Sequence, residues 1–472
     1  MTQDGPKSLW NALTTSIPAP ESFVSSGDAG VARGDLSRGS ILGGRGEELR
    51  GRSVVVMTTD QLSTALALFE LDGIARRIVV CPNETTAGSL PYVVETAEAE
   101  AVVSDLADMP AGIERIRHFV PGGHGVLARG YDRSAPLRTE WITFTSGTMG
   151  RPKLVVHTLS SLIGAIPVGQ APAKRVVWGT LYDIRRFGGM QVFLRATLSG
   201  ASLVLSGPAE PVGSYLERSG RLGITHISGT PSQWRRALMS GAADRIEPEY
   251  VRLSGEIADQ GILNQLRAFY PKARMGHAFG SSEAGTVIEV TDGIAGIPAS
   301  MIGRGPKVET KVEEGTLRVR SGMTAIRYLG KNAPAVKGAD GFVDTGDIME
   351  LREGRYFFAG RRDGRINVGG LKVYPEEVEG VVNLHPQVHL SRVGAKKNAV
   401  TGAVVTADVV LRAAVQGEGR DEQAVKDEIL ELCHKLLPAY KAPAVIRIVS
   451  SLAIAESGKL KRGGGSSPDP SI

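Results

Sequence analysis

A loop rich in hydroxyl groups, glycine and positive charge follows a short apolar segment near residue 145. Residues 141–153 read WITFTSGTMGRPK, and Lys153 closes this run. Glycine lets the backbone approach oxygen atoms closely, while hydroxyl and backbone N–H groups donate hydrogen bonds to them. The lysine adds a charge that attracts phosphate oxygens. The loop therefore predicts a polyphosphate site.

Two other interpretations of this loop are a P-loop and a polar surface turn. A P-loop needs Gly-Lys followed by Ser or Thr, whereas here Gly147 and Gly150 precede Arg151-Pro152-Lys153. The P-loop class is therefore disfavoured. On composition alone, the segment also fits a polar surface turn without function.

Four further segments carry charged side chains among glycines. They read HAFGSSEAG at 277–285, DTGD at 344–347, GRRDGRINVGGLKVYPEEVE at 360–379 and SGKLKR at 457–462. An isolated glutamate such as Glu283, or a lysine late in a chain such as Lys459, is usually a solvated surface charge. These residues indicate a function only through the motifs in which they occur.

The loop and these four segments resemble, in order, the motifs of the adenylate-forming superfamily, which contains acyl-CoA synthetases, adenylation domains and luciferases. With IVVCPNETT and ISGTPSQW, the resemblance covers roughly residues 53–462. Five motifs in the right order make chance improbable. The segment GGLKVYP at 369–375 is closest to acyl- or aryl-CoA ligases.

The resemblance implies a nucleotide site and a reaction. Glu283 would hold Mg²⁺, Phe279 would stack on adenine, and Asp347 would accept hydrogen bonds from the ribose hydroxyls, with Arg361 assisting. Lys459 would neutralise charge where the acid meets the α-phosphate. The implied catalytic residues are Lys459, Glu283 and Thr148. The implied nucleotide-binding residues are Thr145, Ser146, Gly147, Gly150, Lys153, Gly255, Glu256, Phe279, Gly280, Ser282, Asp347 and Arg361.

A hinge and a second half-reaction are also implied. Asp363 matches the hinge residue about which the small domain turns, withdrawing Lys459 and presenting Gly369 and Gly370 as the CoA channel. Adjacent glycines permit close approach of a thin chain such as pantetheine. A carrier-protein phosphopantetheine presents the same arm. The proline usual upstream of the terminal lysine is absent, since the sequence there reads LAIAESGK.

The acid pocket is less readable. The resemblance points to a set of residues in three segments, and YDIRRFGG departs from the usual pattern by placing Arg185 and Arg186 there. Paired arginines could bind a second carboxylate or another polar group on the acid, or they could be surface charges. The expected pocket residues are Tyr182, Arg185, Phe187, Gly188, His226, Ser228 and His277.

The elements that position these residues alternate between strand and helix patterns. Strands are predicted at 53–57, 77–80, 101–103 and 201–205, and helices at 61–71, 232–239 and 261–269. Short strands follow from 310 to 360, then an α+β pattern with strands at 392–394 and 403–411 and a helix at 422–437. The fold class is α/β: a large N-terminal domain of α/β layers with a β-rich subdomain (1–361), a small mobile C-terminal α+β domain (364–462), and a flexible tail (463–472).

Composition bounds the partners. The chain has 472 residues, 42% of them hydrophobic and 22% charged, with a net charge of +5. This charge is spread without a basic stripe, so we expect no nucleic-acid partner. Cys81 and Cys433 have no disulfide or metal-ligand spacing. With no secretory pattern in the first residues and no run of about 18 apolar residues, we expect a cytoplasmic protein without a membrane span.

The predicted function is ATP- and Mg²⁺-dependent activation of a carboxylic acid to an acyl-adenylate with release of pyrophosphate, followed by transfer to CoA. Transfer to a carrier protein or an amine is the alternative. A nucleotide-binding regulator without catalysis would be expected to lack Lys459, Glu283 or Asp347, and all three are present. We expect a monomer or a homodimer.

Overall fold

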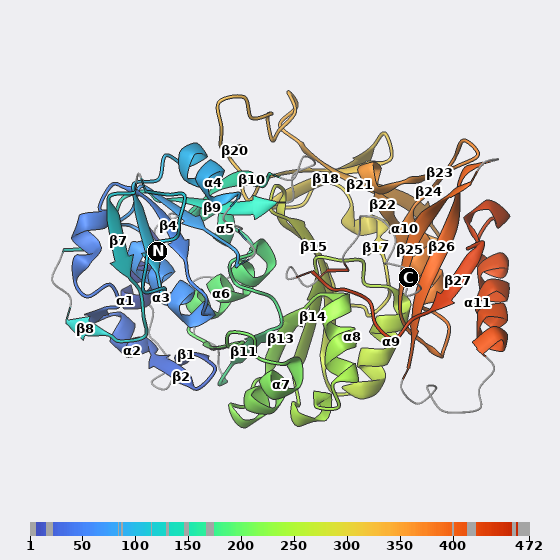
Figure 1. The fold of residues 1–472 in the computed structure, drawn as a ribbon, viewed down its shortest axis with the longest axis horizontal. Helices are drawn as coiled ribbons and strands as arrows, with labels where there is room; N and C mark the ends of the chain where they lie inside the picture. Colours follow the sequence, from blue (N-terminus) through green and yellow to red (C-terminus); the bar gives the residue numbers. More distant parts are fainter. Residues whose placement is uncertain are drawn as a thin grey trace.

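A computed structural model gives the structure of the protein (Figure 1). It describes residues 6–15, 22–83, 85, 88–114, 116–128, 132–145, 151–166, 174–398, 401–412, 422–455 and 459–460, and for Thr15, Leu127, Ala128 and Asp363 the backbone alone. The predicted Ser146, Gly147, Thr148 and Gly150 lie outside the described residues, as does the tail at 463–472.

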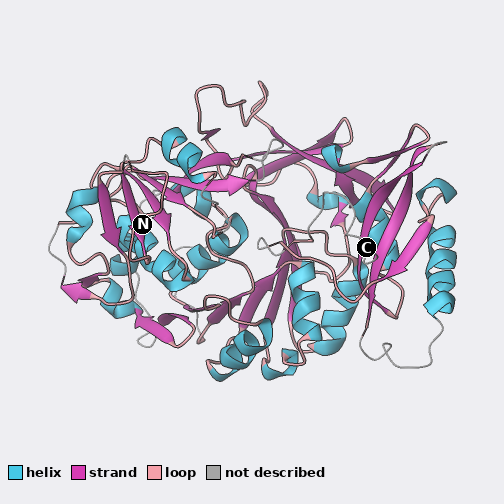
Figure 2. Cartoon of the chain, in the orientation of Figure 1, coloured by secondary structure: helices cyan, strands magenta, loops and turns pink. Residues whose placement is uncertain are grey.

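Two large sheets, drawn as magenta arrows in Figure 2, form the N-terminal part. The first has the strand order β16 (Gly285–Val290), β15 (Arg274–Ser281), β14 (Tyr250–Ser254), β13 (His226–Gly229), β11 (Val177–Thr180), β12 (Ser202–Leu205), β1 (Phe23–Ser26) and β2 (Ala29–Ala32). The second has the order β20 (Arg327–Tyr328), β10 (Lys153–Thr158), β9 (Glu140–Thr145), β5 (Arg77–Val80), β4 (Ser53–Met57), β6 (Ala101–Ser104) and β7 (His118–Pro121). A short pair joins β3 (Gly39–Ser40) to β8 (Leu127–Ala128).

Helices cover the faces of these sheets, because strands such as β4 and β5 are apolar after their first residue and must be buried on both sides. The helices are α1 (Leu9–Thr15), α2 (Arg33–Leu36), α3 (Gln61–Leu71), α4 (Leu90–Thr96), α5 (Leu159–Ile163), α6 (Phe187–Ser199), α7 (Val212–Arg221), α8 (Pro231–Met239) and α9 (Gln260–Phe269). Every residue of α3 is buried, as expected of a helix packed between layers. Asp60 begins this helix by accepting a hydrogen bond from the Ser63 N–H at 3.1 Å.

Two apolar clusters lie on opposite faces of the first sheet. Val251 and Leu253 of β14 pack in a cluster with residues of α7, α8 and α9. Tyr250, one residue earlier than Val251, packs instead in the cluster that contains Met190 and Phe193 of α6. Side chains of β14 therefore alternate between an α6 side and an α7–α9 side.

The predicted β-rich region is confirmed. Its sheet has the order β17 (Ile297–Pro298), β22 (Arg355–Arg361), β21 (Val343–Arg352), β19 (Thr316–Ser321) and β18 (Val308–Glu313). Sharp turns join β18 to β19 and β21 to β22, and Gly315 and Gly354 each take a left-handed conformation there.

The C-terminal part has its own apolar core, built from residues between Ile366 and Leu437. It comprises β23 (Ile366–Val368), β24 (Leu371–Val373), α10 (Pro375–Val382), β25 (Val388–Asn398), β26 (Gly402–Leu411), α11 (Glu422–Leu436) and β27 (Val445–Ile448). Short 3₁₀ segments lie at Arg45–Leu49, Ala243–Arg245, Ala299–Met301, Arg362–Gly364 and Ala439–Lys441. The segment Arg362–Gly364 joins this part to β22.

The sequence showed little pattern before residue 53, yet this region contributes α1, β1 and β2. β1 pairs in parallel with β12, with Val24 opposite Leu203. α1 is fixed through Asp72, which accepts hydrogen bonds from the Leu9 N–H at 2.7 Å and the Trp141 indole at 2.9 Å. Burial raises the pKa of Asp72 to about 6 despite these two donors. Elements of four to seven residues are too short to show a clear period.

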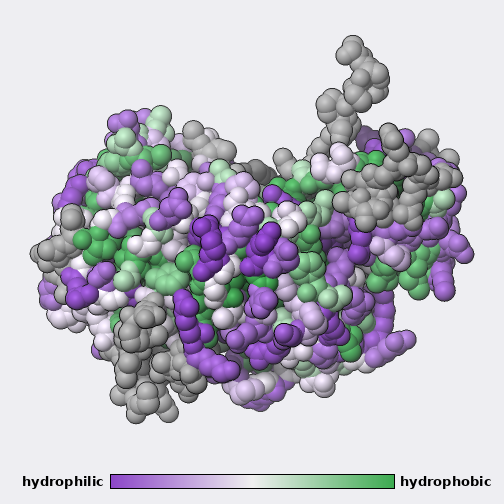
Figure 3. Space-filling model, turned by 90° about the horizontal axis from the view of Figure 1, so that it is seen from below, coloured by the Kyte–Doolittle hydropathy of each residue, from purple (hydrophilic) through white to green (hydrophobic). Residues whose placement is uncertain are grey.

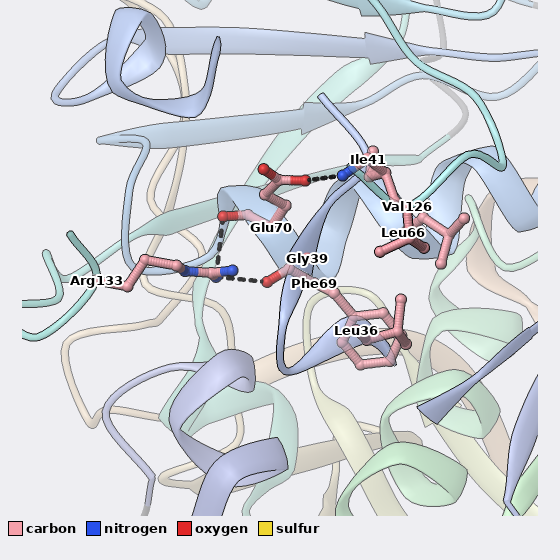
Figure 4. Close-up of a pocket in the computed structure, with 8 residues that line it drawn as sticks. All are labelled: Leu36, Gly39, Ile41, Leu66, Phe69, Glu70, Val126 and Arg133. Carbon is pink, nitrogen blue, oxygen red and sulfur yellow. Dashed lines mark hydrogen bonds between the residues drawn. The ribbon is translucent and has the colours of Figure 1, made fainter. Parts of the chain in front are cut away.

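A small cavity in the N-terminal part lies between α2, α3 and the β3–β8 pair (Figure 4). Its polar groups bind protein atoms: Glu70 accepts from the Ile41 N–H at 2.7 Å, and Arg133 donates to the Phe69 carbonyl at 2.8 Å. These hydrogen bonds connect neighbouring segments, so the polar groups of the cavity have a structural role.

Hydrophilic side chains border the hydrophobic patches on the face shown in Figure 3. No helix among the described residues is both long and apolar enough to cross a membrane. Cys81 and Cys433 are both buried and free, in separate cores.

Candidate active site

The carboxyl ends of β13, β14 and β15 meet at one edge of the first sheet, where the C-terminal segment also arrives. β13, β14 and β15 run parallel, so the residues that follow them gather there. Gly255 directly follows β14 with φ +85, a conformation that favours glycine. A Cβ at this position would lie 3.7 Å from the Lys459 Cε. Lys459, near the end of the chain, therefore reaches the strand ends.

Glu256 ties the terminal segment to this edge. One oxygen of its carboxylate accepts a hydrogen bond from the Leu460 N–H at 2.9 Å, and the other accepts from the Ser232 N–H at 2.9 Å. Glu256 was expected among the nucleotide-binding residues; the structure shows both of its carboxylate oxygens bound to backbone N–H groups. Because Leu460 follows Lys459, these bonds fix where the lysine lies.

The Lys459 ammonium lies among charged groups of the N-terminal part. Although the residue keeps exposed surface, its ammonium is desolvated, and this lowers its pKa. Glu256 and Asp347 act to raise the pKa, whereas the nearby positive charges of Arg361 and Arg186 lower it. A desolvated cation is most useful where an anion arrives.

Asp347 and Arg361 lie opposite each other on β21 and β22. Their side chains form an ion pair, with 3.8 Å between Arg361 Nε and Asp347 Oδ1. Burial raises the pKa of Asp347 to about 6, although Arg361, the Thr345 hydroxyl and Lys459 all act to lower it. A buried carboxylate with unused acceptor capacity suits a pair of ribose hydroxyls.

The phosphate side of the site centres on Tyr328. Its hydroxyl donates to Glu283 Oε1 at 3.1 Å, and the Lys153 ammonium lies 5.5 Å from its ring centroid. Burial and the Glu283 charge raise the Tyr328 pKa above its usual value. Thr145 pairs with Lys153 across the β9–β10 hairpin, and the Thr145 hydroxyl is buried without a hydrogen-bond partner among the residues that the structure describes. An orphaned hydroxyl at the mouth of the predicted loop fits a phosphate oxygen.

His157 is a site residue that the sequence reasoning missed. Its Nε2 donates to the Ser282 carbonyl at 2.7 Å, while its Nδ1 accepts from the Ser161 hydroxyl at 3.0 Å. Burial lowers the pKa of His157 to about 4, outweighing the Ser282 carbonyl and Glu283, so the ring is neutral. It fixes the turn that presents Glu283. Only its position inside the apolar strand KLVVHT could have indicated this role.

The predicted adenine residues lie on β15. Phe279 is half-buried and packs against Phe358 with 5.0 Å between ring centroids. A β-bulge separates it from Gly280, where a Cβ would lie 2.8 Å from the Gly285 carbonyl oxygen. The bulge changes the direction of the strand where Phe279 would meet the base.

Three of the predicted acid-pocket residues, Tyr182, Phe187 and Gly188, lie near the strand ends and the start of α6. Tyr182 lies at the strand ends, where its hydroxyl is 2.9 Å from both the carbonyl and the hydroxyl oxygen of Ser254. Its pKa is raised to about 12 by burial, in spite of Ser254 and Arg252. Gly188, at the start of α6, lies beside the Tyr182 ring, and Phe187 packs near His157 with 5.8 Å between ring centroids.

Ser228 and His226 lie deeper on the same side of the sheet. His226 contacts Trp178 and Tyr250, with ring centroids 4.9 and 5.7 Å away. Ser228 is two residues further along β13 and therefore faces the same way. The structure thus brings Tyr182, Ser228 and His226 to the α6 side.

Two predicted residues do not join them. His277 pairs with Leu253, which faces α7–α9, and its Nε2 is 3.0 Å from the Ile294 carbonyl oxygen. Arg185 is buried rather than exposed, and its guanidinium binds Asp183 at 2.8 Å and also the Thr58 carbonyl and the Asn83 side chain. Its charge is already matched within the protein. It joins loops after β4, β5 and β11.

Gly369 and Gly370 form the turn between β23 and β24. Both have left-handed φ values and are exposed, and the Gly369 N–H donates to the Thr401 carbonyl at 2.9 Å. In Figure 1 this hairpin lies well apart from β13–β15. The backbone of Asp363 lies in the 3₁₀ segment Arg362–Gly364.

Among the described residues, no cluster of three or more histidines, cysteines or carboxylates could hold a metal by itself. Mg²⁺ commonly binds one or two carboxylates together with substrate phosphates. Glu283, with Lys153 and the Thr145 hydroxyl on the same side, fits that kind of site.

The fold and site define a nucleotide-dependent activating enzyme with a small C-terminal domain that inserts a lysine. The chain belongs to the AMP-binding enzymes: the family model described as AMP-binding enzyme matches residues 50–321, and the model described as AMP-binding enzyme C-terminal domain matches residues 377–459. The predicted superfamily and fold class are thereby confirmed, and the chain is an adenylate-forming enzyme.

Relatives and solved structures agree with this assignment. The chain is 28% identical over 338 residues to a 2-succinylbenzoate–CoA ligase of Listeria innocua serovar 6a, covering 69% of each chain. Its fold resembles an anthranilate CoA ligase in complex with anthranoyl-AMP, with TM-score 0.79, 18% identity, and coverage of 96% of this chain and 95% of that one. It also resembles an amide bond synthetase from Marinactinospora thermotolerans, with TM-score 0.76, 19% identity, and coverage of 96% and 97%.

Proposed function

We propose that the enzyme is an acid–thiol ligase that activates a carboxylic acid with ATP and then transfers the acyl group to CoA. The observation that carries the proposal is the position of Lys459. Its side chain lies against Gly255 among Glu256, Asp347 and Arg361, at the edge where the predicted nucleotide residues converge. The presence of Lys459, Glu283 and Asp347 argues against a nucleotide-binding regulator without catalysis.

In the first half-reaction, a carboxylate oxygen of the acid attacks the α-phosphorus of ATP. The bond to the β-phosphate oxygen breaks, and pyrophosphate leaves with that electron pair. Lys459 offsets the charge of the two anions as they meet, which is the largest electrostatic need of the step. Asp347 holds the ribose, Phe279 the adenine, and Thr145 with Lys153 the outer phosphates.

Glu283 would hold Mg²⁺ together with phosphate oxygens. The cation would supply charge neutralisation at the polyphosphate. His157 and Tyr328 position this carboxylate, His157 through the Ser282 carbonyl and Tyr328 through a direct hydrogen bond.

In the second half-reaction, the thiol of CoA loses its proton and attacks the acyl carbonyl, and AMP leaves. We assign domain boundaries at 361 and 364, so that rotation about Asp363 withdraws Lys459 and brings the Gly369-Gly370 turn to the site. The structure has Lys459 at the strand ends and the hairpin exposed on the C-terminal part. That arrangement supports the first half-reaction.

Acid-dependent exchange of labelled pyrophosphate into ATP, run over a panel of aryl, fatty and amino acids, tests the proposal. We expect exchange with at least one class and acyl-CoA when CoA is added. Exchange without acyl-CoA would move the acceptor to a carrier protein or an amine, the latter as in the amide bond synthetase that shares this fold. The absence of exchange with every acid would contradict the proposal.

A further inference from the structure

We propose that the acid carries a second carboxylate, bound by Arg195 and Arg252 between α6 and the first sheet. This inference rests on the proposed function, because it concerns the acid that the enzyme activates. It makes these two arginines specificity-determining residues for a dicarboxylic acid.

Arg252 lies on β14 two residues before Ser254, so the two side chains share the α6 side. Two residues of a strand span about 7 Å. The Tyr182 hydroxyl binds Ser254, and the nearby charge of Arg252 acts to lower the Tyr182 pKa. Arg252 thus lies deeper along the strand than the point where Tyr182 and Ser254 meet. The separation is about the length of a short acyl chain.

Arg195 reaches the same depth from the facing helix. It lies eight residues after Phe187, a distance of about 12 Å along α6. Its charge interacts with Arg252, Glu289 and Tyr250. The two arginines therefore lie on facing elements, one on α6 and the other on the α6 side of β14.

The hydrogen bonds of these guanidinium groups are unmade. The Arg252 side chain is only 7% exposed, and in the described parts of the chain it donates no hydrogen bond; its Nε is enclosed without an acceptor. Its nearest carboxylate oxygen, Glu289 Oε2, is 3.6 Å away. Arg195 likewise donates no hydrogen bond to any described residue. A buried guanidinium left without acceptors is destabilising unless a ligand supplies them.

The charges here do not balance. Three arginines, Arg195, Arg252 and Arg274, act on one carboxylate, Glu289, which already accepts a hydrogen bond from the Tyr250 hydroxyl. Burial and repulsion by Arg252 lower the pKa of Arg195, so the two cations disfavour each other. An anion between them would relieve both, and a carboxylate matches the planar donor fork of arginine.

Ser228 adds a further donor. It lies opposite Arg252 on β13, and its hydroxyl is fully buried without a partner in the described residues. Charged and neutral donors therefore converge on one place, which favours an anionic group over an apolar tail.

The test compares acids that differ by one carboxylate: 2-succinylbenzoate against 3-benzoylpropanoate, and adipate against hexanoate. With wild-type enzyme we expect kcat/KM in pyrophosphate exchange to favour the diacid at least about 100-fold in one pair. Arg252→Met and Arg195→Met should each lose about 10- to 100-fold with that diacid, through KM for the acid, with KM for ATP unchanged. Activity with the monoacid should not fall. Arg236→Met, an exposed arginine on α8, is the matched control and should leave both acids unchanged.

Arg252→Lys guards against a folding artefact, because it keeps the charge and should retain more diacid activity than Arg252→Met. Equal preference for both members of each pair by the wild type, or equal losses with both acids in the variants, would overturn the inference. Calorimetric binding of the same pairs separates it from the proposed function. If no acid supports exchange, diacid binding that is lost in Arg252→Met still supports the anion site, and equal binding of both acids refutes it.

Discussion

Lys459 is the residue on which we propose that the first half-reaction depends most. Because its charge is needed only where the carboxylate meets the α-phosphate, we expect Lys459→Ala to lower pyrophosphate exchange about 100- to 1,000-fold. Thioester formation from supplied acyl-adenylate and CoA should remain largely intact. Lys435→Ala, an exposed lysine on α11, provides the control. Equal loss of both half-reactions would remove Lys459 from this role.

Asp347 predicts a pH dependence of nucleotide binding. Its pKa is raised from 3.8 to about 6 by burial, so between these values the folded protein binds the extra proton. The protonated form stabilises the fold fully below pH 3.8, and that contribution is lost as the pH rises through 6. Binding of the ribose hydroxyls favours the ionised form. Nucleotide affinity therefore changes with pH in the opposite direction to this contribution to fold stability. We expect affinity for AMP to fall up to about tenfold per pH unit below about 6.

Calorimetry in buffers of different ionisation enthalpy measures this effect, since AMP binding near pH 6 should release protons. Asp347→Asn should bind AMP weakly with no such release. A wild-type affinity that is flat from pH 5 to 7 would contradict the role of the carboxylate.

At the residue scale, motifs predicted the groups that we propose to act through their own side chains, such as Lys459, Asp347 and Glu283. They could not identify Arg195 and Arg252, because these residues are distant in sequence and become neighbours only when α6 packs on β14. Arg185 and His277 were misplaced for a related reason. A strand motif does not reveal which side of the sheet each residue faces until the strand order is known.

At the scale of elements, the terminal segment is held by Glu256. Substitution Glu256→Ala removes both acceptors, and losing a charge-assisted hydrogen bond costs about 1.5 to 3 kcal/mol. We expect kcat for pyrophosphate exchange to fall about 10- to 100-fold, with KM for ATP nearly unchanged. The thioester step from supplied acyl-adenylate should be unaffected.

The matched control is Glu217→Ala, an exposed glutamate on α7. If Glu256 instead acts as an adenine-edge residue, KM for ATP rises while kcat stays near the wild-type value. The split between kcat and KM therefore decides between the two roles.

Elements with a strong apolar pattern were predictable at nearly their observed bounds. The helix at Gln61–Leu71 and the strand at Arg77–Val80 are confirmed as predicted. The strand predicted at 392–394 is the centre of the longer β25, whose second half carries Lys396 and Lys397 at an exposed end. Pattern alone cannot extend a strand beyond its buried part.

At the scale of the whole molecule, contacts between the two parts hold the arrangement with Lys459 inserted. Arg235 of α8 donates to Asp259 Oδ2 at 2.6 Å, and Asn383 after α10 donates to the same oxygen at 3.3 Å. The order of strands in the sheets could not be predicted, because β1 pairs with β12 across a separation that no local pattern records.

Domain alternation predicts a selective defect for Asp363→Pro. Proline fixes φ near −65° at the residue that must absorb the rotation, so the two arrangements should stop interconverting. We expect pyrophosphate exchange to persist while acyl-CoA formation falls at least about tenfold, with an unchanged melting temperature. Asp363→Ala, which leaves the backbone free, is the control. An equal fall in both rates in a well-folded variant would argue against rotation about this residue.

The central claim is that the acid attacks the α-phosphorus of ATP before it meets CoA. An acid labelled with ¹⁸O at both carboxylate oxygens tests it directly, because the attacking oxygen becomes part of the adenylate and stays on AMP when the thiol displaces it. After turnover with CoA, mass spectrometry should find one labelled oxygen in AMP and one in the thioester, with none in pyrophosphate. Unlabelled AMP, or label in phosphate or pyrophosphate, would contradict activation through an acyl-adenylate.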